Sequence, residues 1–195
     1  MKHVSQPIAT SSNQWLQTYY FLRAAVSIGW IVLAVGIGRS VPVIGAALLL
    51  AYPAWDAFAN LLDARKSGGL RLNPTQMLNL IVSILTTAAV AIALGISMQA
   101  VIVVFGAWAI LSGLLQLATA VRRWKSAGAQ WVMVLSGGQS ALAGLFFFKM
   151  AVDAAHLDVT AVAPYAALGA FYFLVSAIWL TVKNGRQSSM VAAAR

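Results

Sequence analysis

The chain has 195 residues, of which 61% are hydrophobic and 9% are charged, and its net charge is +9. Soluble domains carry about 25% charged residues, so this composition excludes an ordinary soluble domain and predicts the lipid bilayer as the main partner. The positive charge does not indicate nucleic-acid binding, because the basic residues lie at the ends of long apolar stretches and form no basic surface with interleaved aromatic residues.

Six apolar stretches of about 20 residues predict six membrane-spanning helices. The expected spans are 16–38, 41–63, 74–95, 98–121, 130–149 and 163–183. The first is too long for the apolar core of a secretory signal peptide, so we expect it to be retained. The uncharged segment 72–121 is long enough for two crossings, with a break expected at 95–99. The predicted fold is an all-α polytopic membrane protein with polar tails at 1–15 and 184–195.

The basic residues predict the orientation of these spans. Most of them fall in four places separated by even numbers of spans: Lys2; Arg65, Lys66 and Arg71; Arg122, Arg123 and Lys125; and Lys183, Arg186 and Arg195. Cytoplasmic loops of membrane proteins accumulate Lys and Arg. Both tails are therefore expected in the cytoplasm.

Small residues recur at the same spacing in successive spans. Pairs that are seven residues apart occur in the first, third and fifth spans, and the even spans share a similar pattern of small and aromatic residues. Two helical turns separate such residues, so each pair lies on one helix face and permits close helix packing. This pattern favours three copies of a two-helix hairpin, whereas the alternative is chance similarity between apolar helices. The expected helix-packing residues are Gly29, Gly36, Gly106, Gly113, Gly137 and Gly144. Whether these faces pack within one chain or between copies in a homo-oligomer is left open.

One stretch resembles a known family. Residues 105–117 read FGAWAILSGLLQL, a basic turn RRWK follows at 122–125, and Gln130-Trp131 then lead into Gly137 and Gly144. This order of glycine-spaced helices, basic turn and tryptophan resembles the HdeD-like family of small bacterial inner-membrane proteins associated with acid resistance. The resemblance implies a six-span protein of the bacterial inner membrane that is linked to acid stress, and it supplies no catalytic residues. The first hairpin departs from that family, because Pro53 and Asp56 lie inside a span.

Asp56 is the most informative single residue, because an ionisable group inside a span is costly and often functional. Arg23 lies about as deep in the first span as Asp56 does in the second, so the two side chains are expected to meet. One interpretation is a structural ion pair, with partial snorkelling of Arg23. The other is a protonatable site in a proton or ion pathway. Pro53 adds an expected kink beside this site.

Asp153, His156 and Asp158 form the cluster with ligand-type spacing, in the turn between the fifth and sixth spans. Histidine titrates near pH 6.5 in its unperturbed state, so this outer loop is a candidate pH-responsive element. The alternative is an ordinary solvated loop. Three such residues are too few for a metal site by themselves, so no metal is predicted.

No motif in the sequence predicts catalysis. The sequence lacks both cysteine and glutamate, and it contains no nucleotide-binding motif or intramembrane histidine. We therefore expect no enzyme activity and no cofactor, and the sequence indicates no particular protein partner. The leading hypothesis is a non-enzymatic membrane protein that acts in acid or envelope stress. The alternative is a small transporter or channel for protons, ions or a small solute, which would use the Asp56–Arg23 pair.

Overall fold

The computed structural model describes the backbone of residues 6–126 and 129–193, and the side chains of residues 14–126 and 129–186. Its secondary structure within these ranges is helical. The long helices are α1 (Gln6–Leu33), α2 (Pro42–Lys66), α3 (Pro74–Leu94), α4 (Met98–Arg122), α5 (Gln130–Asp153) and α6 (Ala163–Ala193). Short helical turns are η1 (Ala34–Gly38), η2 (Leu70–Leu72) and η3 (Val159–Val162). All six long helices are long and apolar enough to cross a membrane, which confirms the predicted all-α, six-span fold class.

The helix boundaries follow local sequence signals. Pro42 and Pro74 stand in the first turns of α2 and α3, where a missing N–H costs no helical hydrogen bond. The break between α3 and α4 falls at 95–97, inside the predicted segment, and the Ser97 side chain caps α4 by accepting from the Ala100 N–H at 3.1 Å. Between α2 and η2, Gly68 and Gly69 have φ angles of 95° and 97°, which permits the tight turn.

The helix ends and the course of α2 at Pro53 add detail to the expected spans. Helix α1 already begins at Gln6 and α6 continues to Ala193, so parts of the expected polar tails are helical. Residues 1–5 and 194–195 of those tails lie outside the described residues. Helix α2 runs through Pro53 without a break in its helical assignment. A proline removes a single N–H, and the rest of the helix keeps its own hydrogen bonds.

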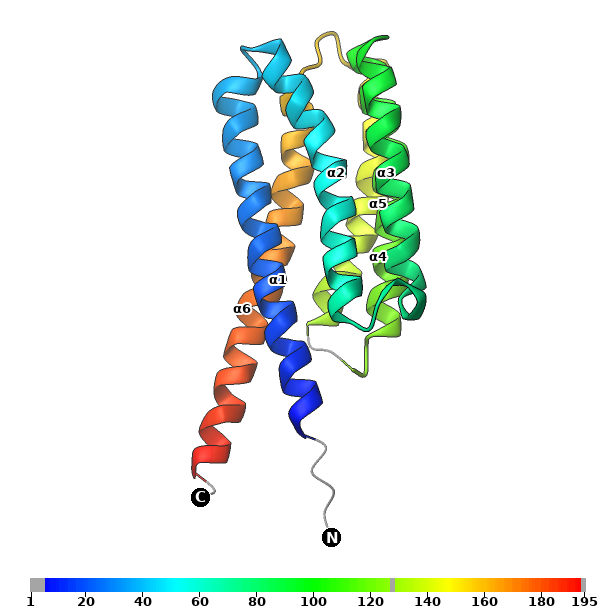
Figure 1. The fold of residues 1–195 in the computed structure, drawn as a ribbon. Helices are drawn as coiled ribbons and strands as arrows, with labels where there is room; N and C mark the ends of the chain where they lie inside the picture. Colours follow the sequence, from blue (N-terminus) through cyan, green and yellow to red (C-terminus); the bar gives the residue numbers. More distant parts are fainter. Residues whose placement is uncertain (1–5, 127–128, 194–195) are drawn as a thin grey trace.

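The helices alternate in direction, so α1 begins and α6 ends at the same end of the bundle (Figure 1). The α2–α3 and α4–α5 turns lie at that end, and they carry Arg65, Lys66, Arg71, Arg122, Arg123 and Lys125. We call it the basic end. The α1–α2 and α5–α6 connections lie at the opposite end.

Close packing is distributed unevenly around the bundle. Helix α4 packs most extensively on α5, followed by the pairs α1/α6, α2/α3 and α3/α4, whereas α1/α2 and α5/α6 touch much less. Figure 1 shows α1 and α6 side by side, next to a group formed by α2 to α5. Consecutive helices run antiparallel, but the α1/α2 and α5/α6 pairs are loosely packed, and much of the tightest packing joins the second helix of one predicted hairpin to the first helix of another.

Glycines explain the tight α4/α5 contact. A Cβ added at Gly106 would lie 2.9 Å from the Gly144 carbonyl oxygen, and one added at Gly113 would lie 2.6 Å from the Gly137 carbonyl oxygen. These four glycines lie on the helix contact for which they were predicted. The prediction for Gly29 and Gly36 needs correction, because no atom of the described residues lies within 4 Å of a Cβ at either position. Their seven-residue spacing puts them on one face of the first span, but no helix packs closely on that face.

The interior toward the opposite end is apolar. Buried side chains from all six helices meet there, and we call this cluster the apolar plug: Trp30, Ala34, Leu48, Leu49, Val90, Ala93, Val101, Ile102, Phe105, Phe147, Val162 and Ala166. The outside of the bundle is also apolar, with exposed side chains such as Val43, Ile92, Leu142 and Val152. An apolar exterior of this kind suits contact with lipid chains.

Candidate functional site

A cavity of about 110 Å³ lies inside the half of the bundle nearest the basic end. All six long helices contribute to its wall, and many of the contributing side chains are polar. They include Arg23 and Ser27 of α1, Asp56, Asn60 and Asp63 of α2, Gln76 and Asn79 of α3, Ser112, Gln116 and Thr119 of α4, Ser136, Gln139 and Ser140 of α5, and Tyr165 and Tyr172 of α6. Ionisable residues are costly to bury inside a membrane bundle, and they commonly mark functional sites.

Asp56 lies in the wall of this cavity with a complete set of hydrogen-bond donors. Its side chain forms an ion pair with Arg23 and accepts from Asn60 Nδ2 at 3.0 Å. It also accepts from Asn79 Nδ2 at 3.1 Å and from Ser83 Oγ at 2.9 Å. Asp56 is only 5% exposed. One cationic and three neutral donors satisfy the acceptor capacity of a buried carboxylate, so the site is well matched to a charged group.

Arg23 joins α1 to the rest of the site. The structure brings its guanidinium to Asp56, as the equal depths of the two residues predicted. Its Nη1 donates to the Tyr19 hydroxyl at 3.1 Å, and its Cζ lies 4.3 Å from the centre of the Phe173 ring on α6. This is cation–π distance. Arg23 thus holds together α1, α2 and α6, including the loosely packed α1/α2 pair.

An aromatic layer separates the cavity from the apolar plug. Tyr52, Trp108 and Tyr165 come from three different helices and meet edge to face, with ring centres 5.7 to 6.3 Å apart. Trp108 also donates its indole N–H to Ser83 Oγ at 3.0 Å, and Tyr165 shares a 2.8 Å hydrogen bond with Ser140. The layer is therefore fixed by ring packing and by hydrogen bonds.

A second carboxylate, Asp63, lies at the end of the cavity that faces the basic turns. It is 4% exposed and forms an ion pair with Arg123 at 2.8 Å. Gln76 donates to it at 3.3 Å and the Trp15 indole N–H at 3.2 Å. Arg123 also donates to Ser67 Oγ at 3.0 Å. Asp63 therefore ties the end of α2 to α1, α3 and the end of α4.

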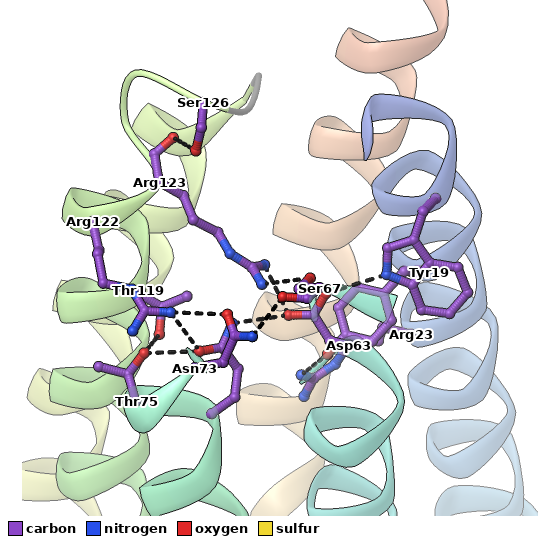
Figure 2. A network of polar contacts seen from close by, with 12 residues as sticks. Tyr19, Arg23, Asp63, Ser67, Asn73, Thr75, Thr119, Arg122, Arg123 and Ser126 are labelled. Carbon is purple, nitrogen blue, oxygen red and sulfur yellow. Dashed lines mark hydrogen bonds and ion pairs between the residues drawn. The ribbon is translucent and has the colours of Figure 1, made fainter. Parts of the chain in front are cut away.

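Neighbouring contacts extend this tie into a polar network, shown in Figure 2. Arg122 donates to Asn73 at 3.0 Å and to Gln76 at 3.2 Å. Thr119 donates to Thr75 at 2.7 Å. In Figure 2, Arg122 and Arg123 reach from the end of α4 toward the α2–α3 turn. We call the contacts of Asp63, Arg122 and Arg123 the polar clasp, which holds the α2–α3 turn to α4.

Three polar groups of the cavity wall have no hydrogen-bond partner within the described residues. Two are the Asn79 side-chain oxygen and the Ser112 hydroxyl, and both residues are 8% exposed. The third is Arg23 Nε. Buried polar groups in proteins are normally hydrogen-bonded. These atoms therefore identify the part of the wall where a bound water or solute would gain hydrogen bonds.

The outer-loop residues have different bonding partners, although His156 and Asp158 line the same shallow hollow. Asp153 at the end of α5 pairs with Lys149 one turn earlier, and Asp158 caps η3 by accepting from the Thr160 N–H at 2.7 Å. His156 is exposed between them. Across the described part of the chain, no three His, Cys, Asp or Glu side chains lie close enough together to hold a metal ion. The aspartates face different partners because one ends a helix and the other begins a helical turn.

Asp63, Arg123 and Ser112 were not predicted as site residues from the sequence. Asp63 was expected at the end of a span, and Arg123 as part of a basic cluster that sets the orientation. A usable signal was present in the polar positions 76, 79 and 83 of α3 and 112, 116 and 119 of α4, because spacings of three, four and seven place residues on one helix face. Two such polar faces in otherwise apolar helices indicate a shared polar interior.

Fold and site together define a multi-pass membrane protein with six helices around a polar internal cavity. Residues 81–149, which cover most of α3, all of α4 and nearly all of α5, match the family described as a short repeat of unknown function (DUF308). That family contains the HdeD-like membrane proteins. No curated protein and no solved structure matches the chain.

Proposed function

We propose that this chain is a non-enzymatic protein of the bacterial inner membrane that takes a small solute or ion into its polar cavity. The observation that carries this proposal is the cavity itself. Polar and charged side chains are expensive inside a membrane, so a protein that only altered the lipid would gain nothing from burying them. A polar chamber that all six helices line is instead the arrangement expected of a protein that handles a solute.

The hydrogen bonds and ion pairs of the two buried carboxylates favour binding over catalysis. Asp56 and Asp63 each hold an arginine and at least two further hydrogen-bond donors. A general base needs an oxygen that is available to take a proton from a substrate. With their oxygens engaged in this way, both residues are suited to shaping and stabilising the wall.

The proposal also includes a role in acid or envelope stress and an orientation in the membrane. The resemblance to HdeD-like proteins and the DUF308 match support a role in acid or envelope stress. The basic clusters support cytoplasmic placement of both chain ends. With this orientation the cavity lies in the cytoplasmic half of the membrane, and the apolar plug lies between the cavity and the periplasm.

Solute uptake into liposomes tests the proposal. Purified protein is reconstituted, and the entry of small polar solutes and of ions is compared with that into protein-free liposomes. We expect faster uptake with the protein, and a reduction in Ser112→Leu and Ser136→Leu, which each place an apolar side chain into the cavity. Asp153→Asn serves as the control outside the cavity. Equal uptake with and without well-folded protein would contradict transport, and chemical labelling of the cavity wall would then decide whether a solute enters the cavity.

A second candidate is proton transport through Asp56, favoured by the position of the Asp56–Arg23 pair in the cavity wall. Proton flux measured over about pH 4 to 7, a range that includes the ordinary histidine pKa, addresses it. Flux that Asp56→Asn abolishes in a folded protein would support this candidate. If Asp56→Asn instead lowers stability, and Arg23→Gln in the same chain restores it, the pair is structural.

A further inference from the structure

We infer that the cavity selects an uncharged solute with several hydrogen-bonding groups, the class to which glycerol and urea belong. This inference rests on the proposed function, because it requires that a solute enters the cavity. It goes further by naming the class of solute and by excluding ions. Charge balance, unpartnered polar atoms and the size of the cavity each point to this class.

The charges of the wall balance one another. Its charged side chains are Arg23, Asp56, Asp63 and Arg123, two of each sign, and each carboxylate is in contact with one arginine. A cation that entered would have to break one of these pairs to find a counter-charge, and the arginine left behind would be buried without compensation. An anion at the unpartnered Arg23 Nε would bring a second negative charge to a guanidinium that Asp56 already neutralises. An uncharged solute requires no such exchange.

The unpartnered atoms of the wall fit a neutral hydrogen-bonding solute. The Asn79 side-chain oxygen accepts hydrogen bonds, whereas the Ser112 hydroxyl both donates and accepts. They lie on adjacent helices, α3 and α4. A solute with O–H or N–H groups and an oxygen acceptor can satisfy both atoms. A purely apolar solute would leave both without partners in a buried site, which is unfavourable.

The cavity is also small. A buried water needs about 10 to 15 Å³ of cavity volume, so a cavity of about 110 Å³ has room for roughly seven to eleven waters or for one solute of similar total size. Typical sites for drug-sized ligands are roughly 300 to 1,000 Å³. At the closed end, Tyr52, Trp108 and Tyr165 offer ring surfaces against which C–H groups can pack. The size favours glycerol or urea over a sugar.

Because the sequence has no cysteine, single cysteines can report on access to the cavity. Ser112→Cys is treated with 2-hydroxyethyl methanethiosulfonate, which is neutral, and separately with its positively charged trimethylammonioethyl and negatively charged sulfonatoethyl analogues. The thiolate displaces sulfinate from each reagent and forms a disulfide, which mass spectrometry detects. We expect the neutral reagent to modify Cys at position 112, and both charged reagents to react at least roughly a hundredfold more slowly, because an uncompensated charge inside a membrane bundle costs several kcal/mol.

Two further serines provide matched controls. Ser176 is 0% exposed and its hydroxyl is also without a partner, but it does not line the cavity. Ser176→Cys should therefore resist all three reagents. Ser126, in the exposed turn after α4, should react with all three as Ser126→Cys. The first control separates entry into the cavity from passage through lipid and protein in general, and the second shows that each reagent is active.

Protection by solutes completes the test. Glycerol and urea should each slow the neutral modification of Ser112→Cys several-fold, whereas sucrose at equal osmolality should not, because it is too large for the cavity. Equal protection by sucrose would indicate an osmotic effect and would overturn the size argument.

The outcomes separate this inference from the proposed function. Rapid modification of Ser112→Cys by a charged reagent would overturn the selection of uncharged solutes and leave a solute or ion cavity standing. No modification by any reagent, in folded protein in which Ser126→Cys reacts, would overturn both. Modification by the neutral reagent alone, with protection by glycerol and urea, supports both.

Discussion

The two halves of the bundle interior are built by the same six helices but filled by opposite kinds of side chain. On α2, the inward residue is Leu49 in the apolar plug and Asp56 two turns later. On α3 the corresponding residues are Val90 and Asn79. The polarity of the interior therefore depends on depth along each helix, and each helix changes character at the level of the aromatic layer.

Each half of the interior is stabilised by a different kind of interaction, close packing in one half and charge pairing in the other. In the plug, α4 and α5 approach until backbone touches backbone at Gly106 and Gly144, so stability depends on shape. Around the cavity, carboxylates and arginines are matched through hydrogen bonds, so stability depends on keeping charges paired. Substitutions should accordingly reveal a half that is sensitive to size and a half that is sensitive to charge.

The largest effect is expected from Asp56→Ala. It leaves Arg23 buried without a counter-charge, and breaking a buried pair in this way costs about 3 to 5 kcal/mol. Unfolding in mixed detergent micelles measures the loss. Arg23→Leu in the same chain should recover most of it, because no uncompensated charge then remains. A single variant as stable as the unmodified protein would show that charge pairing does not hold this half together.

The next effect is expected from Gly144→Ala in the plug half. The new methyl group would lie 2.5 Å from the Gly106 carbonyl oxygen, so α4 and α5 must separate, and overpacking of this kind costs about 1 to 3 kcal/mol. Gly138→Ala on the same helix is the control, because its methyl group would meet nothing within 4 Å. The same unfolding assay applies to both. Equal stability of the two variants would refute the role assigned to close packing.

A smaller loss is expected from Arg123→Gln at the edge of the cavity. It removes the charged partner of Asp63, but Gln76 and Trp15 still donate to this carboxylate and the basic end is close to water. We expect a loss of about 1 to 2 kcal/mol. Lys125→Gln, an exposed residue in the same turn, should change stability very little. If Arg123→Gln lowered the free energy of unfolding as much as Asp56→Ala, the depth of an ion pair in the bundle would not determine its contribution to stability.

The smallest effect is expected from Asp153→Asn. The Lys149–Asp153 pair is one helical turn long and exposed, and such surface pairs contribute little. The unfolding midpoint should stay unchanged. A clear loss would show that ion pairs matter here irrespective of burial, which would remove the distinction between the cavity pairs and the rest.

Much of the fold was predictable because a membrane span can be recognised from the hydropathy of consecutive residues alone. Each span is a continuous apolar run, and the observed break at 95–97 lies inside the segment 95–99 where it was predicted. The meeting of Asp56 and Arg23 was also predictable, because two neighbouring antiparallel spans place residues of equal depth side by side. The role of Asp63 was not, since a carboxylate at a span end has the same local pattern whether it faces water or Arg123.

The sequence by itself determined the class of protein, the number of spans, the positions of the turns and the depth of the buried charges. These properties follow from composition and from distance along a helix. Only the tertiary structure decided which faces meet. It brought Gly113 against Gly137 but left open space beside Gly29 within the described part of the chain, and it gathered polar side chains of six helices around one cavity. The physical reason is that a cavity depends on the rotation of each helix about its axis, and packing between helices sets that rotation.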